Sequence, residues 1–183
     1  MQYVCYPELG NNPGDVCFIL DSSGSIGETG WSAILYLVSR VVSRLDVSGG
    51  YHRVALVTIA NKAHVNLLLS ELHTEDDVIE RLHTLPFKDQ KTNMSGALYV
   101  TRKTVFQESN GDRRYINNVV VTISDGVPNV AENETMVEAT SLKCEGARMV
   151  SIGMGEEMNM TTLHDMAYET SSGMLYPIAM HCA

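Results

Sequence analysis

The sequence predicts an α/β domain of the doubly wound type, with a mostly parallel six-stranded sheet, one antiparallel edge strand and helices on both faces. Apolar runs of strand length alternate along the chain with longer segments whose apolar residues recur at helical spacing. One connection between strands, Ala60-Asn61-Lys62, has only the length of a hairpin turn. The strand after this turn is therefore expected to run antiparallel, at the edge of the sheet.

The first half of the chain is expected to contain three strands and two helices. The run Val16-Cys17-Phe18-Ile19-Leu20 is typical of a strand buried on both faces. Apolar residues at helical spacing between Ile34 and Leu45 indicate a long amphipathic helix, and Thr74-Glu75-Asp76-Asp77 indicates a helix start. In chain order, the expected elements are a strand at 15–21, a helix at 29–46, strands at 53–59 and 63–69, and a helix from about residue 74.

The second half continues the alternation, with a buried central strand around Val119-Val120-Val121. In chain order, its expected elements are a helix at 94–107, a strand at 115–124, a helix at 133–143, a strand at 147–153, a helix at 161–169 and a strand at 174–178. Residues 1–14, rich in Pro and Gly, are expected to form a lead-in, and residues 15–183 a single domain.

Composition excludes several classes of function. The formal net charge is −9, and no cluster of Lys and Arg is present to neutralise phosphates, which argues against nucleic acid as a partner. No apolar stretch is long enough to span a bilayer, so direct membrane insertion is not expected.

Four cysteines allow three pairings. Cys5 and Cys182 lie near opposite ends of the chain, and a bridge between them is expected because domain termini often lie close together. Such a bridge stabilises by roughly 4–5 kcal/mol in the chain-entropy model. Cys17 and Cys144 either pack as free thiols, the favoured alternative, or pair with each other.

Glycosylation motifs begin at Asn133 and Asn159, with a further match at Asn93. Together with the cysteines they favour a secreted, extracellular-matrix location. The N-terminus lacks the basic start and apolar stretch of a signal peptide, so we expect a domain of a longer secreted or membrane-anchored protein.

A candidate metal site follows the first strand. In the run Asp21-Ser22-Ser23-Gly24-Ser25, the first, third and fifth residues alternate, so an extended loop turns three oxygens toward one point. The strand at 115–124 also ends on an acid, Asp125, and Thr92 lies in a polar loop before a helix. Loops after parallel strands meet at one edge of a sheet, where these oxygens suit a hard cation such as Mg²⁺.

These elements resemble the von Willebrand factor type A domain, whose metal-ion-dependent adhesion site (MIDAS) has them in the same order. The resemblance covers roughly residues 15–178 and implies a Rossmann-like fold of that family. It implies that Ser23 and Ser25 bind Mg²⁺ or Mn²⁺ through their hydroxyls, and that Thr92 binds directly in the ligand-occupied state and through water otherwise. It also implies that Asp21 and Asp125 hold the coordinating waters. An open position would then accept a carboxylate from a partner protein.

Alternative interpretations remain at this stage. The two acids are also compatible with solvated loop carboxylates, and Ser23, Ser25 and Thr92 with helix caps. A second alternative keeps the metal but places the partner elsewhere on the domain. A magnesium-dependent hydrolase is less favoured, because the chain has no phosphate loop and no nucleophile elbow.

The resemblance favours a non-enzymatic module of the matrix type, like the A domains of matrilins, collagen VI and von Willebrand factor. Collagen or another matrix protein is its expected partner, and a cell-surface or complement-type adhesion module is the runner-up. The family usually ends in a C-terminal helix, but after Ile178 only Ala179 to Ala183 remain, so this helix is expected to be short or absent.

Overall fold

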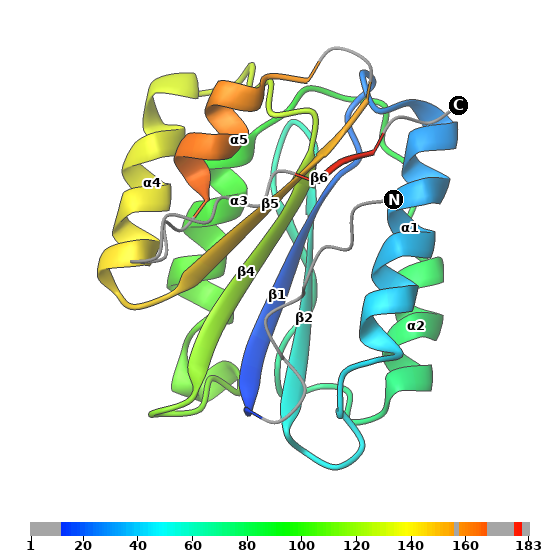
Figure 1. Cartoon of the computed structure of the whole chain (residues 1–183), viewed down its shortest axis with the longest axis vertical. Coiled ribbons are helices and arrows are strands. Elements are labelled where there is room, and N and C mark those ends of the chain that lie inside the picture. Colours follow the sequence, from blue (N-terminus) through cyan, green and yellow to red (C-terminus); the bar gives the residue numbers. More distant parts are fainter. Residues whose placement is uncertain (1–11, 156–157, 168–177, 181–183) are drawn as a thin grey trace.

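The computed structural model describes residues 12–155, 158–167 and 178–180, with helices packed on both faces of a central sheet (Figure 1). The strands are β1 Gly14–Asp21, β2 His52–Ile59, β3 His64–Leu67, β4 Asn117–Ser124, β5 Arg148–Met154 and β6 Ile178–Met180. The α-helices are α1 Gly27–Val42, α2 Glu75–His83, α3 Met94–Val100, α4 Glu132–Cys144 and α5 Met160–Met166. None of these helices is long and apolar enough to cross a membrane.

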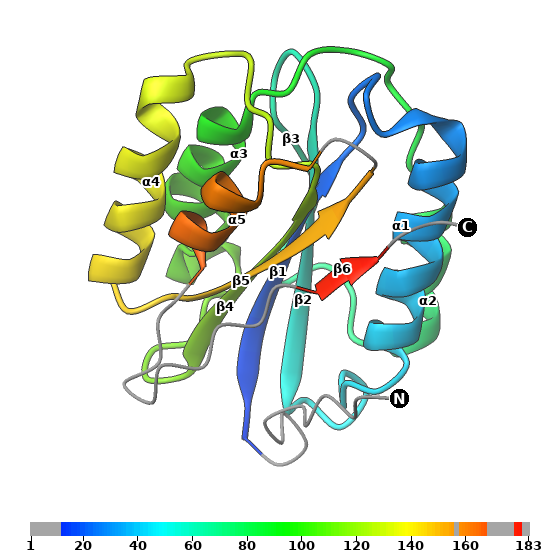
Figure 2. The same ribbon diagram turned by 45° about the horizontal axis from the view of Figure 1, so that its top comes forward.

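The six strands form one sheet in the order β3-β2-β1-β4-β5-β6. All neighbouring pairs are parallel except β2 and β3, which confirms the antiparallel edge strand expected from the short turn. The register aligns Asp21 with Ile59 and Leu20 with Ile123. The carboxyl ends of β1 and β4, which carry the predicted site, therefore emerge side by side at one edge of the sheet (Figure 2).

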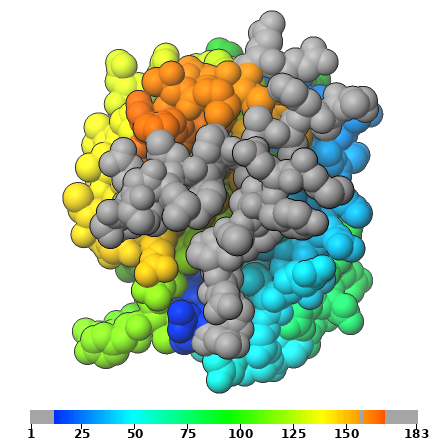
Figure 3. Space-filling model, viewed as in Figure 1, coloured from blue at the N-terminus to red at the C-terminus, as the bar shows by residue number. Residues whose placement is uncertain are grey.

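Successive residues of β1 point to opposite faces, and each face has its own apolar core. Phe18 packs with Trp31, Ile34 and other residues of α1 and α2, whereas Ile19 packs with residues of α3, α4 and α5. In the space-filling view, α4 and α5 (yellow and orange) make one flank of the molecule and α1 (blue to cyan) the other (Figure 3). The sheet thus lies between two layers of helices, each packed through its own apolar core.

Several predicted boundaries differ from the structure; among them, the helix expected at 29–46 ends at Val42 and the strand expected at 63–69 ends at Leu67. The strand expected at 115–124 begins at Asn117, because Tyr115 has φ of 71° and belongs to a turn. The strand expected at 174–178 corresponds to β6, which extends to Met180; residues 174–177 lie outside the described part, so the predicted start is not tested. The helix expected at 94–107 is α-helical only to Val100.

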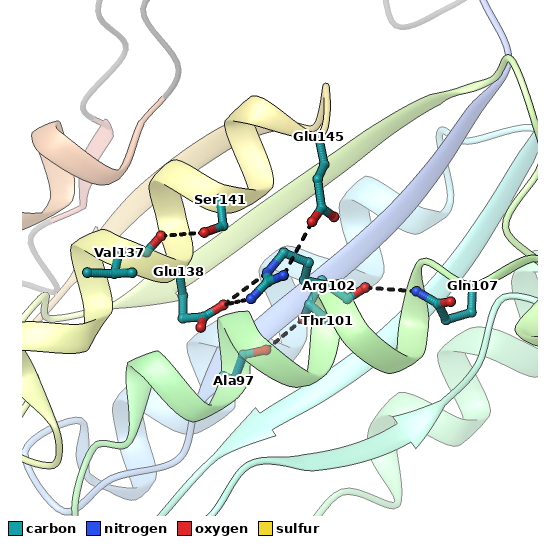
Figure 4. A network of polar contacts seen from close by, with 8 residues as sticks. All are labelled: Ala97, Thr101, Arg102, Gln107, Val137, Glu138, Ser141 and Glu145. Atoms are coloured by element: carbon teal, nitrogen blue, oxygen red, sulfur yellow. Dashed lines mark hydrogen bonds and ion pairs between the residues drawn. The ribbon is translucent and has the colours of Figure 1, made fainter.

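Beyond α3 the chain forms a π-helical turn, Thr101–Val105, and then a short 3₁₀ turn, Glu108–Asn110. Figure 4 shows that Arg102 of the π-helical turn reaches across to α4. Its Nε and Nη2 atoms donate to one carboxylate oxygen of Glu138, at 3.0 and 2.7 Å, and Nη1 donates to Glu145 at 3.3 Å. The π-helical turn therefore carries a charged side chain that links this turn to α4.

Candidate metal centre

Three loops meet at the carboxyl edge of the sheet. They are residues 22–26 after β1, residues 84–93 between α2 and α3, and residues 125–131 after β4. The first two are joined by backbone bonds, since Gly24 N donates to Gln90 O at 3.0 Å and Asp89 N donates to Ser22 O at 3.1 Å. These bonds hold the loop that precedes Thr92 beside the serine loop.

Asp21 ends β1 and is completely buried. Its Oδ1 accepts the backbone N–H of Ser23 at 2.9 Å, and its Oδ2 accepts the hydroxyl of Ser124 at 2.6 Å. Burial raises the pKa of Asp21, these hydrogen bonds oppose the rise, and the negative charge of nearby Asp125 adds to it. The two carboxylates are therefore close enough to repel each other.

The two predicted serines lie together. The Ser23 and Ser25 hydroxyl oxygens are 3.1 Å apart; Ser23 is buried and Ser25 is exposed. The two hydroxyls therefore lie on the same side of the loop. The pair therefore offers two hydroxyl oxygens at the mouth of the site.

Thr92 is fully buried, and its hydroxyl has no hydrogen-bond partner among the residues that the structure describes. Its backbone, in contrast, is held firmly. Its N–H donates to the side-chain oxygen of Asn129 at 2.8 Å, and its carbonyl accepts the N–H of Asn129 at 3.1 Å. The loop after β4 therefore fixes Thr92, while its hydroxyl remains available to a ligand.

Asp125 follows β4 and is 4% exposed. Its Oδ1 accepts the backbone N–H of Val127 at 2.9 Å, and its carbonyl accepts the N–H of Asn159 at 2.8 Å. Among the described residues, neither Asp125 nor Asp21 forms an ion pair with Lys, Arg or His. Two buried carboxylates thus lie close together without a protein cation, an arrangement that a bound cation would stabilise.

With this geometry established, comparison with known proteins decides the family. The sequence matches the family model of the von Willebrand factor type A domain over residues 15–179. The chain belongs to the von Willebrand factor type A domain family.

Relatives of this A domain include matrix proteins. It is 28% identical to mouse collagen alpha-4(VI) chain over 145 residues, which are 78% of this chain and 6% of that protein. It is 25% identical to human matrilin-1 over 178 residues, 97% of this chain and 34% of the relative. The chain thus spans about a third of matrilin-1 and 6% of the collagen chain.

Solved structures show the same fold. Proximal thread matrix protein 1 from the mussel byssus, in the form with a zinc-occupied MIDAS motif, gives a TM-score of 0.82 at 19% identity. That match covers 92% of this A domain and 44% of the other chain. Manganese-loaded TRAP protein of Plasmodium vivax gives 0.76 at 20% identity, over 86% of this chain and 63% of the other.

The helix-cap interpretation of the A-domain hydroxyls does not hold. The N-cap of α1 is Ile26, and no side-chain hydrogen bond caps that helix. The N-cap of α3 is Asn93, whose side chain accepts the N–H of Gly96 at 2.8 Å. Ser23, Ser25 and Thr92 therefore have no capping role that would explain them.

The donor set fits a hard divalent cation. It consists of oxygen atoms only, from two carboxylates and three hydroxyls, as Mg²⁺ and Mn²⁺ prefer. Within the described residues, no group of three or more His, Cys, Asp and Glu could hold a metal. A cation at this edge of the A domain would thus depend on hydroxyl groups, among them the unpartnered Thr92.

Two residues that support the site were not among the predicted site residues. Ser124 donates to Asp21, and Asn129 holds Thr92 through both its side chain and its backbone. Ser124 directly precedes Asp125, so its place at the end of the same strand could be predicted from the sequence. Asn129 could not be predicted in this way, because its contact joins two loops that are 37 residues apart.

The four cysteines were also given predicted roles. Cys5 and Cys182 are outside the described residues, so their bridge stays a prediction. Cys17 and Cys144 are both free, as favoured; Cys17 is buried, with a pKa that burial raises to about 12, but Cys144 is exposed rather than buried.

The two predicted glycosylation positions are exposed. Asn133 lies in the first turn of α4. Asn159 caps α5 through its side-chain oxygen. The further match at Asn93 is half-buried, and both ends of its side chain are engaged, with Asn61 and Gly96. Glycosylation is therefore still expected only at the first two positions.

Proposed function

We propose that this A domain is a secreted, non-enzymatic adhesion module of the extracellular matrix that binds Mg²⁺ or Mn²⁺ and, through it, a protein partner. Collagen or another matrix protein is the proposed partner. The observation that carries the proposal is the buried hydroxyl of Thr92, which has no partner in the described part of the chain, while the Thr92 backbone is held by the loop that carries Asp125. A buried polar group without a partner is costly unless a ligand uses it.

In this proposal Ser23 and Ser25 would hold the ion through their hydroxyls, and Thr92 would hold it directly when the partner is bound and through a water otherwise. Asp21 and Asp125 compensate its charge and accept hydrogen bonds from its waters. When bound, the ion supplies an electrophilic position for a carboxylate of the partner. The hydrogen bonds from Ser23 and Ser124 keep the Asp21 carboxylate oriented, so that the site is formed before the partner arrives.

The comparisons support two general parts of the proposal, metal binding and a role in the matrix. Zinc and manganese are named for two neighbours of the same fold, and collagen VI, matrilin-1 and the byssal thread protein are matrix proteins by name. These names favour a matrix partner over a cell-surface or complement-type partner, which remains the second candidate. They also favour adhesion over hydrolysis.

The decisive experiment measures binding to immobilised fibrillar collagen in Mg²⁺ and again with excess EDTA. We expect binding that is lost on chelation. Binding that survives EDTA would place the interface away from the metal, and no binding in either buffer would exclude fibrillar collagen as the partner.

Substitution of Asp21 tests the metal site independently of any partner. We expect Asp21→Ala to lower Mg²⁺ and Mn²⁺ affinity at least about tenfold in calorimetric titrations, because the variant lacks one of two carboxylates facing the ion. Asp76→Ala, which removes an exposed carboxylate from α2, is the matched control and should titrate like the wild type. An unchanged titration of Asp21→Ala would contradict the site assignment.

A further inference from the structure

Three of the chain's five lysines lie in two segments that are joined to each other. Lys62 lies in the turn between β2 and β3, and Lys88 and Lys91 lie in the loop between α2 and α3. Asn61 joins the two segments, because its N–H donates to Gln90 Oε1 at 3.3 Å and its Oδ1 accepts the N–H of Lys91 at 3.1 Å. Both segments lie at the upper end of the molecule in the two ribbon views (Figures 1 and 2). We call the three lysines the lysine rim.

The lysine rim adjoins the predicted metal ligands. The carbonyl of Gln90 accepts the N–H of Gly24 at 3.0 Å, and Gln90 pairs with Ser23 in an isolated parallel bridge. Lys91 directly precedes Thr92; Lys91 is exposed, whereas Thr92 is buried. The same stretch of backbone thus carries a predicted metal ligand and, one residue away, an exposed cation.

The segments of the lysine rim carry more positive than negative charge. Among the residues that the structure describes, none of the three lysines forms an ion pair. Asp89 is the one acid in the turn and loop that carry them, so three positive charges stand against one negative charge. Further acids at this edge begin the helices after the other two loops, Glu28 in α1 and Glu132 and Glu134 in α4. The carboxyl edge of the sheet is therefore polarised, basic on the β3 side and acidic toward α1 and α4.

We propose that the lysine rim binds an acidic side chain of the partner, next to the carboxylate that completes the metal shell. This inference rests on the proposed function and deepens it, because it gives the partner a chemical signature of two neighbouring acids. The occupant follows from continuity with the metal site and from charge complementarity. A bound divalent cation compensates Asp21 and Asp125, so the lysines remain as the surplus charge beside it.

A protein segment fits the lysine rim better than a long polyanion such as a sulfated polysaccharide. The basic part of the edge is short, because it consists of one turn and one loop. Beyond it a polyanion would meet the acids of α1 and α4, on a chain with a formal net charge of −9. A segment with two acids places one on the ion and one on the lysine rim and brings no further negative charge to the acidic side.

The test uses short peptides that differ by one charge. A biotinylated glycine–glycine–glutamate–glycine–glycine peptide is compared with versions whose first or last residue is aspartate, each displayed densely on streptavidin. The intact chain is bound to them in saturating Mn²⁺ and in EDTA, at about 50 and about 500 mM NaCl. We expect at least one aspartate peptide to bind about three- to tenfold more tightly than the glycine peptide in Mn²⁺ at low salt, because exposed charge pairs contribute modestly. The advantage should vanish at high salt, which screens such pairs.

Two triple variants with the same net charge locate the contact. Lys62→Gln/Lys88→Gln/Lys91→Gln removes the lysine rim but keeps the backbone bond of residue 91, and should reduce the aspartate advantage to near parity. The matched control should keep the advantage, because it replaces by glutamine three exposed cations at the opposite edge of the sheet, namely Arg44, Lys103 and Arg148. In calorimetric titrations the Mn²⁺ affinity of the first variant should equal or exceed that of the wild type, since a loss of positive charge does not weaken a cation site.

The failures are distinguishable. Equal affinity for all three peptides in Mn²⁺, metal binding without capture of any peptide, an aspartate advantage that survives without the lysine rim, or an equal loss in both triple variants would overturn the lysine rim alone. Heparin binding that only the first variant loses, without any aspartate advantage, would also overturn it, because the lysines would then serve a polysaccharide. Absence of any calorimetric Mn²⁺ binding would overturn the proposed function, and the lysine rim with it.

Discussion

At the residue scale, the metal site combines satisfied and unsatisfied buried polar groups. Both oxygens of Asp21 accept hydrogen bonds, whereas the Thr92 hydroxyl forms none with residues 12–155, 158–167 or 178–180. A buried hydroxyl without a partner costs about 1–3 kcal/mol in folding free energy. A threonine at position 92 is therefore better explained by ligand binding than by stability.

Thr92→Val tests this explanation, because valine has the same shape and lacks the hydroxyl. We expect the metal-free variant to be about 1 kcal/mol more stable than the wild type in urea unfolding, since an unpaired buried hydroxyl is removed. Its Mg²⁺ and Mn²⁺ affinities should fall about tenfold or more in calorimetric titrations.

Thr122→Val provides the matched comparison. The Thr122 hydroxyl is buried and lies 3.1 Å from the Ser151 hydroxyl, to which it donates, so its loss should destabilise by about 1 kcal/mol without changing metal affinity. If Thr92→Val were destabilised in the same way and kept its metal affinity, the assignment of Thr92 would be wrong.

At the element scale, Arg102 joins the π-helical turn after α3 to α4 (Figure 4). Its side chain is 12% exposed, and that of its partner Glu138 is 16% exposed. These two helices follow the loops that carry Thr92 and Asp125, so their packing sets the distance between two parts of the site. The Arg102 contact therefore belongs to the support of the metal site.

Arg102→Ala should destabilise the chain by about 1–2 kcal/mol, because it leaves a half-buried carboxylate without its charged hydrogen bonds. The control is Arg114→Ala, whose pair with Glu108 is 3.4 Å long and has 72% and 68% exposed side chains. That pair should contribute less than about 0.5 kcal/mol. Urea unfolding of both variants measures the difference, and equal losses would contradict the role given to Arg102.

At the scale of the whole molecule, Arg113 ties distant segments together at the edge opposite the metal site. It forms an ion pair of 2.7 Å with Asp15, which is completely buried in β1. Its remaining donors reach the carbonyls of Gly14, Gly50 and Tyr51. One side chain thus holds the beginnings of β1 and β2 against the segment before β4.

Arg113→Ala should therefore cost about 3–5 kcal/mol in urea unfolding, because it leaves the Asp15 charge buried and unpaired. Adding Asp15→Asn to this variant removes the charge and should recover part of the loss. A double variant that is no more stable than Arg113→Ala would show that the cost comes from elsewhere.

Most of the fold was predictable from the sequence, because it rests on local patterns. The run from Val16 to Leu20 fits only a strand buried on both sides, and the turn at residues 60–62 is too short for anything but an antiparallel pair. The predicted end of the helix at 94–107 was wrong because a local pattern competes there with a tertiary contact. Residues 101–107 have helical character in sequence, but the observed chain leaves the α-helix at Thr101, where Arg102 binds across to α4.

The candidate site, like the fold, was predictable from the sequence only in part. By itself, the sequence determined which residues end the strands and alternate in the loop, because strand period and loop order are properties of neighbouring residues. Only the tertiary structure decided that Ser124 orients Asp21, that Asn129 holds Thr92 and that Gly126 lies against the start of α5. These contacts join segments far apart in the chain, and burial and hydrogen bonding between such segments exist only after the sheet has brought them together.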